Sequence, residues 1–435
     1  MDLQDWSPEG SHRWRLPPRG AMAVPVVALA SEALLHAMEE GVRERACWIA
    51  QLPGITGHVA LLPHAHGGDG FPIGAVAGFD AQHGGVVSPG GVGFDVACGV
   101  RCLLTGLRRE QILESRAALE EALAAHIPAG ISSPGGIPVM ADGLEAMLRG
   151  GARWAVEQGW GYPEDLLACE HHGHFDAAEP AAVSERAKQR LRHGLGTLGS
   201  GNHALEVQWV AELWDGAVAQ QFGLALEGVV VLLHGGSRGL GHQVSSDYLE
   251  LMAGQMAKRG LALPQLELAY APIGSELGQR YLGAMQAAAN CAFANRQILT
   301  QLVREVFAGL WPEAELRPLV DLSHNLCSVE DHLIGHDSRR LHVHRRGATR
   351  AHGPGHGALR EPFCRTGQPV LIAGATGTGS TVLAGLDSGE ALALSSACHG
   401  AGSSPSGVEA VALSAERAGL ARRVARLEPL LSIKG

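Results

Sequence analysis

The chain has 435 residues and a formal net charge of −10, with 46% hydrophobic and 18% charged residues. This composition is typical of a globular protein and excludes a largely disordered one. The acidic balance also argues against a protein that coats nucleic acid non-specifically, because such a coat needs an excess of lysine and arginine.

The N-terminal part of the chain changes character several times. Residues 1–19 are polar and rich in proline and glycine, so we expect a flexible tail there and one large domain over residues 20–435. A helix is expected near residues 31–45. Residues 53–101 are dense in glycine, and they contain short strand-like runs at 59–62 and 86–87.

The remaining chain mixes helical and strand-like segments. Helical periodicity returns at 109–126 and 140–158 and is followed by a polar, loop-rich stretch at 170–202. A long helical region is expected over residues 243–307, with interruptions near Pro264 and Pro272. Further strands are expected at 204–210, 229–233, 318–322, 341–344 and 369–372. This order lacks a regular strand–helix alternation and predicts a single α+β domain, with central β-sheets flanked by helices.

Cysteine usage and hydropathy indicate the compartment. Eight cysteines are scattered singly, and a chain of this size needs no disulfide framework, so a reducing cytoplasm is expected. The segment between Arg13 and Ala30 imitates part of a secretory signal, but the acidic start of the chain and Pro25 argue against one. No apolar run is long enough to cross a membrane, so no membrane partner is expected.

An RNA-related function would require a local basic patch on this acidic body. The best candidate is the segment 339–350, which also holds His342 and His344. A solvated loop is the alternative interpretation of the same segment. Its arginines are Arg339, Arg340, Arg345, Arg346 and Arg350.

Histidine is the unusual residue of this sequence, at 22 positions, and several histidines stand in glycine-rich turns after apolar strands. Such a position leaves the imidazole and the neighbouring backbone free to meet a ligand. Taken singly, each of these histidines is more often a structural residue. The turn at 234–241 also contains Ser237 and Arg238, which would suit a phosphate cradle.

One carboxylate, one thiolate and three imidazoles in these turns form a candidate metal-ligand set. Asp95 and Cys98 are three residues apart, so a turn can direct both side chains to one point. Taken alone, a cysteine such as Cys98 is more often a small buried hydrophobe than a ligand. Two divalent cations sharing the thiolate would use the whole set, and ligand softness alone favours zinc as readily as manganese. The set is Asp95, Cys98, His203, His234 and His324.

The turn at 398–402 holds a candidate nucleophile, His399. A neutral imidazole is a competent nucleophile toward a phosphoryl group, and the small residues Gly400, Ala401 and Gly402 would let the backbone approach a nucleotide. A cysteine-protease fragment at Cys398 is a weaker interpretation, because a nucleophilic cysteine and its base are normally distant in sequence.

From about residue 24 to the C-terminus, these segments resemble in content and order the RtcB family of RNA ligases, as a divergent, bacterial-type member. Each motif alone is commonplace, whereas their shared order is specific. The matching segments are 70–74, 88–101, 195–203, 234–242, 294–296, 323–325, 344–350, 354–356, 399–402 and 434–435.

The resemblance implies a fold with a metal-holding cleft and a specific reaction. Such enzymes join RNA ends that carry a 3′-phosphate or 2′,3′-cyclic phosphate to 5′-hydroxyl ends, in RNA repair or tRNA-splicing ligation. They use GTP and Mn²⁺ and pass through a histidine–GMP adduct. The implied partners are RNA with broken ends, such as tRNA or rRNA, together with GTP, and an activating protein is a further candidate.

Carried over position by position, the resemblance makes the five candidate ligands a site for two manganese ions and makes His399 the guanylylated histidine. Glu206 would accept hydrogen bonds from the guanine N1–H and N2 amine, a pattern that adenine does not offer. The positions that match the guanosine-nucleotide site are Asn202, His203, Glu206, Asn325, Ala373, Gly374, Ala375, Thr376, Ser380, His399, Gly400, Ala401, Gly402 and Lys434.

The chain also departs from the family at two places. Where members usually read Met-Pro-Asp-Val-His, residues 62–66 read Leu-Pro-His-Ala-His, so that His64 replaces a carboxylate. An Arg-x-x-Ser-Arg pattern after the nucleophile is replaced by residues 403–407, Ser-Ser-Pro-Ser-Gly, which contain no arginine. We therefore expect a ligase with a narrowed RNA substrate. The alternatives are a dinuclear metal phosphodiesterase or phosphatase, and a non-catalytic RNA- or nucleotide-binding relative.

Overall fold

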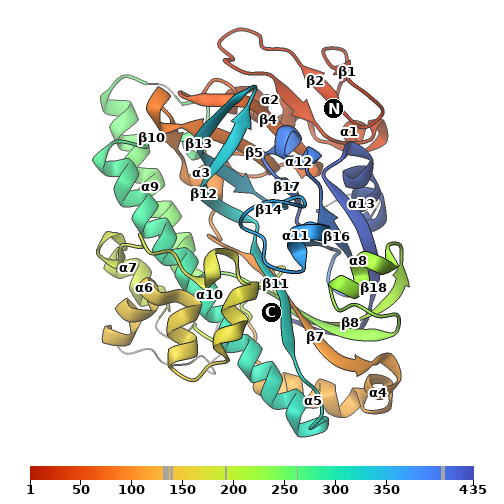
Figure 1. Ribbon diagram of the computed structural model, residues 1–435. Coiled ribbons are helices and arrows are strands. Elements are labelled where there is room, and N and C mark those ends of the chain that lie inside the picture. Colours follow the sequence, from red (N-terminus) through yellow and green to blue (C-terminus); the bar gives the residue numbers. More distant parts are fainter. Residues whose placement is uncertain (131–136, 138–140, 192–193, 262, 403–406) are drawn as a thin grey trace.

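The computed structural model describes residues 1–435 except 131–136, 138–140, 192–193, 262 and 403–406. Two seven-stranded sheets form the centre of the molecule, and helices cover them from the outside (Figure 1). The predicted α+β fold is therefore confirmed.

Sheet I is formed by the N-terminal strands and one later hairpin. All its neighbouring strands are antiparallel except β3 and β4, which run parallel. The order of its strands is β1 (Ser7–Pro8), β2 (Trp14–Leu16), β3 (Val26–Ala28), β4 (Ile55–His66), β5 (Ile73–Asp80), β13 (Asp337–Arg346) and β12 (Asn325–Ile334).

Sheet II is antiparallel throughout and carries the candidate metal ligands at one edge. Its strand order is β11 (Arg317–Ser323), β7 (Gly99–Arg108), β9 (Gly228–Gly235), β8 (Ala204–Leu213), β18 (Ala421–Lys434), β16 (Ser380–Gly385) and β15 (Pro369–Ala373). Two small ribbons complete the strands: β6 (Val86–Val87) with β10 (Ala271–Pro272), and β14 (Ala348–Arg350) with β17 (Ser396–Cys398).

The longest helix, α10 (Glu276–Leu310), runs beside the sheets together with α9 (Arg238–Lys258) (Figure 1). Ser275 caps its start by accepting a hydrogen bond from the Gly278 N–H. Alanine and leucine dominate its sequence, and most of its middle turns are buried, which explains why it forms a helix and lies in the core. A third helix, α6 (Ala141–Glu157), packs along it.

The remaining helices are short. The α-helices are α1 (Glu32–Ala37), α2 (Glu40–Ile49), α3 (Pro89–Val92), α4 (Arg109–Glu114), α5 (Arg116–His126), α7 (Glu185–Leu191), α8 (Gly216–Gln221), α11 (Phe363–Thr366), α12 (Ser388–Ala393) and α13 (Gly407–Ala418). The 3₁₀ turns are η1 (Ala81–His83), η2 (Pro163–Ala168), η3 (Glu170–Gly173), η4 (Pro180–Ala182) and η5 (Leu266–Leu268).

The N-terminal segment differs from its expectation. Residues 1–19, for which we expected a flexible tail, contain β1 and β2, and β2 pairs with β3 in sheet I. Trp6 and Leu16 are buried, and the Trp14 indole N–H donates to the Ala30 carbonyl oxygen at 3.1 Å. These few apolar side chains attach a polar segment to the domain, so residues 1–19 are packed against it.

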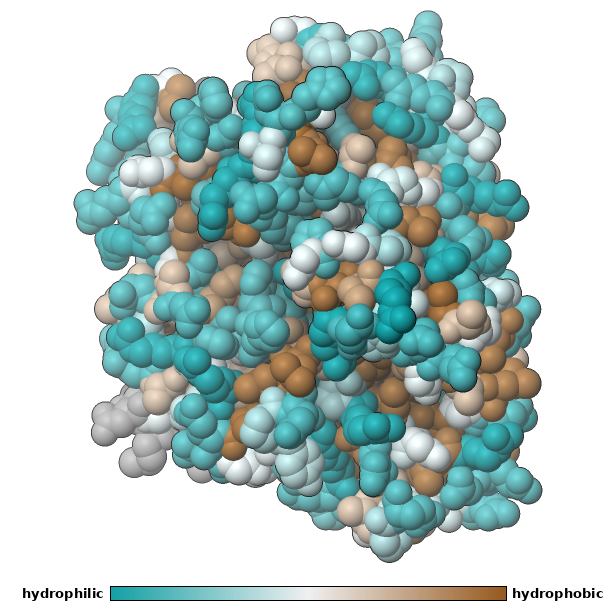
Figure 2. Space-filling view, viewed as in Figure 1, coloured by the Kyte–Doolittle hydropathy of each residue, from teal (hydrophilic) through white to brown (hydrophobic). Residues whose placement is uncertain are grey.

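The face of the molecule drawn in Figure 2 is largely polar. Figure 2 shows hydrophilic side chains over most of the face in view, with apolar side chains in scattered groups between them. Among the described residues, no helix is both long enough and apolar enough to span a bilayer.

Candidate active site

The five candidate metal ligands stand where neighbouring strands of sheet II end. Asp95 and Cys98 lie just before β7, and His234 is near the end of β9. His203 comes directly before β8, and His324 directly follows β11. The register places the start of β7 beside the ends of β9 and β11, and the start of β8 beside His234. Antiparallel pairing thus brings candidate ligands from distant parts of the sequence together at one end of these neighbouring strands.

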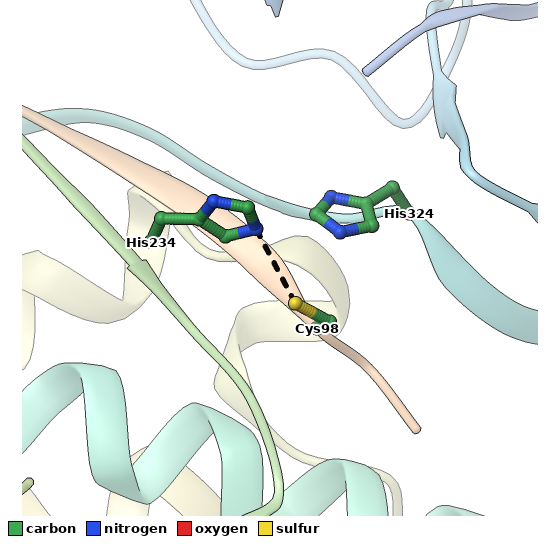
Figure 3. Close-up of side chains that lie close together, drawn as sticks. All are labelled: Cys98, His234 and His324. Carbon is green, nitrogen blue, oxygen red and sulfur yellow. Dashed lines mark hydrogen bonds between the residues drawn. The ribbon is translucent and has the colours of Figure 1, made fainter. Parts of the chain in front are cut away.

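The Cys98 thiol lies at the centre of this group. Its Sγ is 3.3 Å from the Nε2 atoms of both His203 and His234. The Asp95 Oδ2 lies 2.8 Å from the His203 Nε2. On the other side, the imidazoles of His234 and His324 face each other above the sulfur, with ring centroids 5.2 Å apart (Figure 3). The structure therefore brings the five predicted ligands together.

These residues divide into two groups that share Cys98. One contains Cys98, His234 and His324, the other Asp95, Cys98 and His203, and the ligand atoms within each group lie within 4.8 Å of one another. A thiolate between two sets of nitrogen and oxygen donors suits a pair of divalent cations. Cys98, His203 and His324 are buried, whereas Asp95 and His234 are partly exposed, which leaves the site open on one side.

Burial sets the protonation of the cluster in the absence of a cation. It lowers the pKa of His234 to about 3 and the pKa of His324 well below its usual value, so both imidazoles are neutral ligands at pH 7. Burial and the neighbouring Asp95 raise the pKa of Cys98 well above its usual value. A divalent cation would reverse this last effect, because a coordinating thiol is deprotonated.

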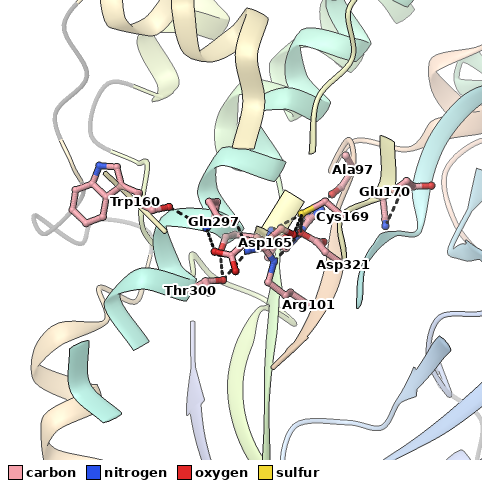
Figure 4. Close-up of polar contacts among 12 residues, drawn as sticks. Ala97, Arg101, Trp160, Asp165, Cys169, Glu170, Gln297, Thr300 and Asp321 are labelled. Atoms are coloured by element: carbon pink, nitrogen blue, oxygen red, sulfur yellow. Dashed lines mark hydrogen bonds and ion pairs between the residues drawn. The ribbon is translucent and has the colours of Figure 1, made fainter. Parts of the chain in front are cut away.

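A buried polar network beneath the cluster fixes the strands that carry it (Figure 4). Asp321, on β11, accepts from Arg101 Nε at 2.9 Å and from Arg296 Nε at 2.7 Å, and all three side chains are fully buried. Arg296 also donates to the carbonyl oxygens of Ala97 and Gly235, each at 2.9 Å. These are the neighbours of Cys98 and His234, so one guanidinium fixes two ligand-bearing turns.

The backbone in front of Cys98 is strained, which makes this support necessary. Ala97 has a φ of 53°, a left-handed conformation that costs a residue with a side chain about 1 kcal/mol. Its N–H donates to the Asn325 carbonyl oxygen at 2.7 Å, and its own carbonyl oxygen accepts from Arg296. The strain therefore persists because the peptide groups on both sides of the Ala97 Cα are hydrogen-bonded.

His399 lies beside the metal-ligand cluster, as the sequence predicted. Its ring centroid is 4.3 Å from that of His324, and the side chain is only partly buried. Its Nδ1 lies 2.7 Å from the Gly347 carbonyl oxygen. Burial lowers the pKa of His399 to about 4, so the imidazole is neutral at pH 7 and can carry a lone pair for attack.

The turns that match the nucleotide site are joined in space. The Ala373 N–H donates to the His399 carbonyl oxygen at 3.1 Å, and the Ala401 N–H donates to the Ala373 carbonyl oxygen at 2.9 Å. A cleft of about 620 Å³ opens beside them, lined in part by Ala375, Ser380 and Ala401. Its size suits a nucleoside.

The other predicted nucleotide residues have varied positions. The Glu206 carboxylate is buried and accepts from the Gly377 N–H at 2.7 Å, so it supports the loop between β15 and β16. Asn325 donates to the Asp95 carbonyl oxygen at 3.2 Å and accepts from the Gly347 N–H at 2.9 Å, which links the turn of Asp95 to the residue that contacts His399. Asn202 is an exposed turn residue, and Lys434 is exposed at the end of β18.

The basic segment at 339–350 is largely not a free patch. Arg345 is buried in β13 and ion-paired with Glu330, and Arg346 is buried and donates to the Gly90 carbonyl oxygen at 2.9 Å. Neighbouring residues of β13 point to opposite faces of sheet I, and each face is covered there, by Leu394 and Ser396 at Arg345 and by Gly90 at Arg346, which the count of arginines did not reveal. Residues 403–406, where the family arginine pattern is missing, lie outside the described residues.

His64 and Gly347 both contact His399, although the sequence indicates no role for either residue in the site. The His64 Nε2 lies 3.0 Å from the His399 Nδ1 and 2.8 Å from the Gly347 carbonyl oxygen. The one sequence feature that could have indicated a role for His64 was its departure from the family motif. At Gly347 the signal was its place within a matching segment, where a φ of 62° favours glycine.

Comparisons with known proteins agree with this site. A family model described as "tRNA-splicing ligase RtcB" matches residues 45–410. The chain is 43% identical over 397 residues to a tRNA-splicing ligase RtcB of Archaeoglobus fulgidus, covering 90% of this chain and 82% of that relative. It is also 43% identical over 429 residues to the RNA-splicing ligase RtcB of Mycobacterium bovis, covering 89% of this chain and 99% of that relative.

Proposed function

Because the chain belongs to the RtcB family of RNA ligases, we propose that it uses GTP and Mn²⁺ to join RNA 3′-phosphate or 2′,3′-cyclic phosphate ends to 5′-hydroxyl ends. The family assignment made from the motifs is confirmed, and with it the expectation of an RNA ligase. The observation that carries the finer proposal is the position of His399 against the two ligand groups that share Cys98.

The donor set fits two manganese ions. Asp95 and His203 would hold one ion and His234 and His324 the other, with the Cys98 thiolate between them. Divalent cations bound there would polarise phosphate oxygens and offset the charge of the departing pyrophosphate. Partly exposed Asp95 and His234 leave room for substrate oxygens on the open side.

His399 would act as the nucleophile. In its reactive form Nδ1–H donates to the Gly347 carbonyl oxygen, which leaves the lone pair on Nε2. A bond forms between Nε2 and the α-phosphorus of GTP while the bond to the pyrophosphate oxygen breaks, and pyrophosphate leaves with that electron pair. The resulting phosphoramidate passes GMP to the RNA 3′-phosphate, which is then activated toward the 5′-hydroxyl.

The cleft beside Ala375 and Ser380 would hold the guanosine. Ser380 Oγ is buried and has no hydrogen-bond partner among the described residues, so it is available to a ligand. Glu206 would recognise the guanine N1–H and N2 amine by exchanging its present backbone partner, Gly377, for the base. We therefore expect GTP to be used in preference to ATP.

We propose broken tRNA or rRNA as the substrate, in RNA repair or tRNA-splicing ligation, with an activating protein as a candidate partner. The missing arginines at 403–407 favour a narrow substrate range. We propose the cytoplasm as its location because all eight cysteines are free, including Cys98, whose thiolate the proposed mechanism requires.

One labelling experiment tests this function. Purified protein is incubated with α-labelled GTP and Mn²⁺, and we expect acid-labile label on the protein, as for a phosphoramidate. The variant His399→Ala should take up none, and His36→Ala, an exposed histidine, should label like the wild type. Absence of label on the wild type would overturn the proposal. Sealing of a 3′-phosphate RNA to a 5′-hydroxyl RNA is then measured on the same samples.

A further inference from the structure

The contact between His64 and the nucleophile has a geometry that allows only one proton. His64 Nε2, His399 Nδ1 and the Gly347 carbonyl oxygen form a triangle with sides of 3.0, 2.8 and 2.7 Å. The oxygen can only accept hydrogen bonds. The nitrogen–nitrogen distance of 3.0 Å is that of a hydrogen bond, which needs one donor and one acceptor, and two N–H groups turned toward the same oxygen would crowd their hydrogens together. We therefore infer that one nitrogen carries a proton and the other a lone pair.

The position of that proton decides whether His399 can react. When it lies on His399 Nδ1, the lone pair of that ring is on Nε2, and the nucleophile is armed. When it lies on His64 Nε2, His399 accepts at Nδ1 and carries its own proton on Nε2, where attack would occur. In this second form the nucleophile is disarmed. Both forms are neutral, so they differ only in tautomer.

His64 has little else to fix its own tautomer. The side chain is 3% exposed, and its Nδ1 is buried without a hydrogen-bond partner among the described residues. Gly74 packs against the His64 ring and Gly347 against the His399 ring, so both rings are held in place. A carboxylate at position 64 would only accept and would keep the proton on His399, whereas an imidazole can also donate.

We propose that His64 is a positioning residue that sets the tautomer of His399 and lets the nucleophile rest in its disarmed form. The inference rests on the proposed role of His399. The rate of guanylylation is then the rate of the armed form multiplied by the fraction of protein in that form. Replacing the ambivalent imidazole by a side chain that only accepts should therefore accelerate the first step of the reaction.

Two variants of equal size test this. His64→Asp can only accept at the triangle, while His64→Asn can both accept and donate. We expect His64→Asp to label with GTP about two- to ten-fold faster than His64→Asn and the wild type, with an unchanged KM for GTP. The variant His58→Asn, on the same strand and bonded to the Leu392 carbonyl oxygen, controls for the loss of a β4 histidine and should label like the wild type.

The tautomer itself can be observed without any nucleotide. In ¹⁵N-histidine-labelled protein, the two ring nitrogens of His399, assigned by comparison with His399→Ala, should show mixed tautomers in the wild type and the Nδ1–H tautomer in His64→Asp. A wild type already entirely in the Nδ1–H form, or equal labelling rates for His64→Asp and His64→Asn, would overturn the inference. If neither the wild type nor any variant takes up GMP label, the proposed function fails, and the ¹⁵N chemical shifts of His399 still decide the role of His64.

Discussion

The substitution Asp321→Asn should lower the free energy of unfolding, for reasons that the structure shows directly. The Asp321 carboxylate is fully buried and accepts three hydrogen bonds from guanidinium groups, two from Arg101 and one from Arg296, at 2.6–2.9 Å. Burial alone would raise the pKa of Asp321, but the two guanidinium groups hold it below its usual value. The carboxylate is therefore charged and balances two buried cations.

Removing this charge should strongly destabilise the folded protein. An asparagine keeps the shape, but it leaves Arg101 and Arg296 without their shared anion and turns an amide N–H group toward a guanidinium. Breaking a buried ion pair by removal of one partner costs about 3–5 kcal/mol. We expect a loss of that size in the free energy of unfolding. Weaker manganese binding should accompany it, because Arg296 also supports the turns at Ala97 and Gly235.

The assay is urea unfolding of the metal-free protein, followed by circular dichroism. Asp5→Asn is the matched control, because Asp5 also contacts two arginines, Arg19 and Arg43, but at the surface. Exposed ion pairs contribute less than about 1 kcal/mol. Equal losses of stability in Asp321→Asn and Asp5→Asn would show that the buried network does not stabilise the strands that carry the site.

Three further predictions concern the site and one distant cluster. Cys98→Ser should lower the manganese bound per chain from two ions to one or none, measured by equilibrium dialysis, and unchanged stoichiometry would contradict a shared thiolate. Gly347→Ala should slow GTP labelling about ten-fold or more, because the φ of 62° is strained for alanine and the new methyl group would meet Ile73 and the His399 ring. A labelling rate of Gly347→Ala equal to that of the wild type would contradict this. His332 lies between Glu330 and Glu390, and although burial alone would lower its pKa, these hydrogen bonds raise it above the unfolded value of about 6.5. The stabilising contribution of His332 is thus present below that value and is lost as the pH rises through the folded pKa. In urea unfolding, His332→Gln should therefore lose more stability relative to the wild type at about pH 6 than at about pH 9. A loss of stability that is the same at both pH values would contradict this prediction.

The convergence of the metal ligands could be predicted because each follows a local rule. Asp95, His203, His234 and His324 all stand in turns directly before or after, or at the end of, apolar strands, and such ends meet at the edge of a sheet. The sequence order of the motifs then identified the family. The hydrogen bonds that support these turns could not be predicted from the turn sequences, because Arg296 donates them from the middle of α10.

Other features were missed for physical reasons. The strand β18 has no clean two-residue alternation, because bulges shift its register between Arg426 and Leu427 and again between Pro429 and Leu431. The buried state of Arg345 depends on Glu330 across the β12–β13 hairpin, which composition does not show. The contact of His64 with His399 joins residues 335 positions apart, and only the packing of β4 against β17 creates it.

We propose that one thiolate and four flanking ligands hold two cations against the His399 imidazole. Anomalous diffraction at the manganese edge, from crystals grown with Mn²⁺, would locate these cations. We expect two anomalous peaks, one on each side of the Cys98 sulfur, with His203 and Asp95 at one and His234 and His324 at the other. Peaks away from Cys98, or none in the wild-type protein at saturating Mn²⁺, would contradict the account.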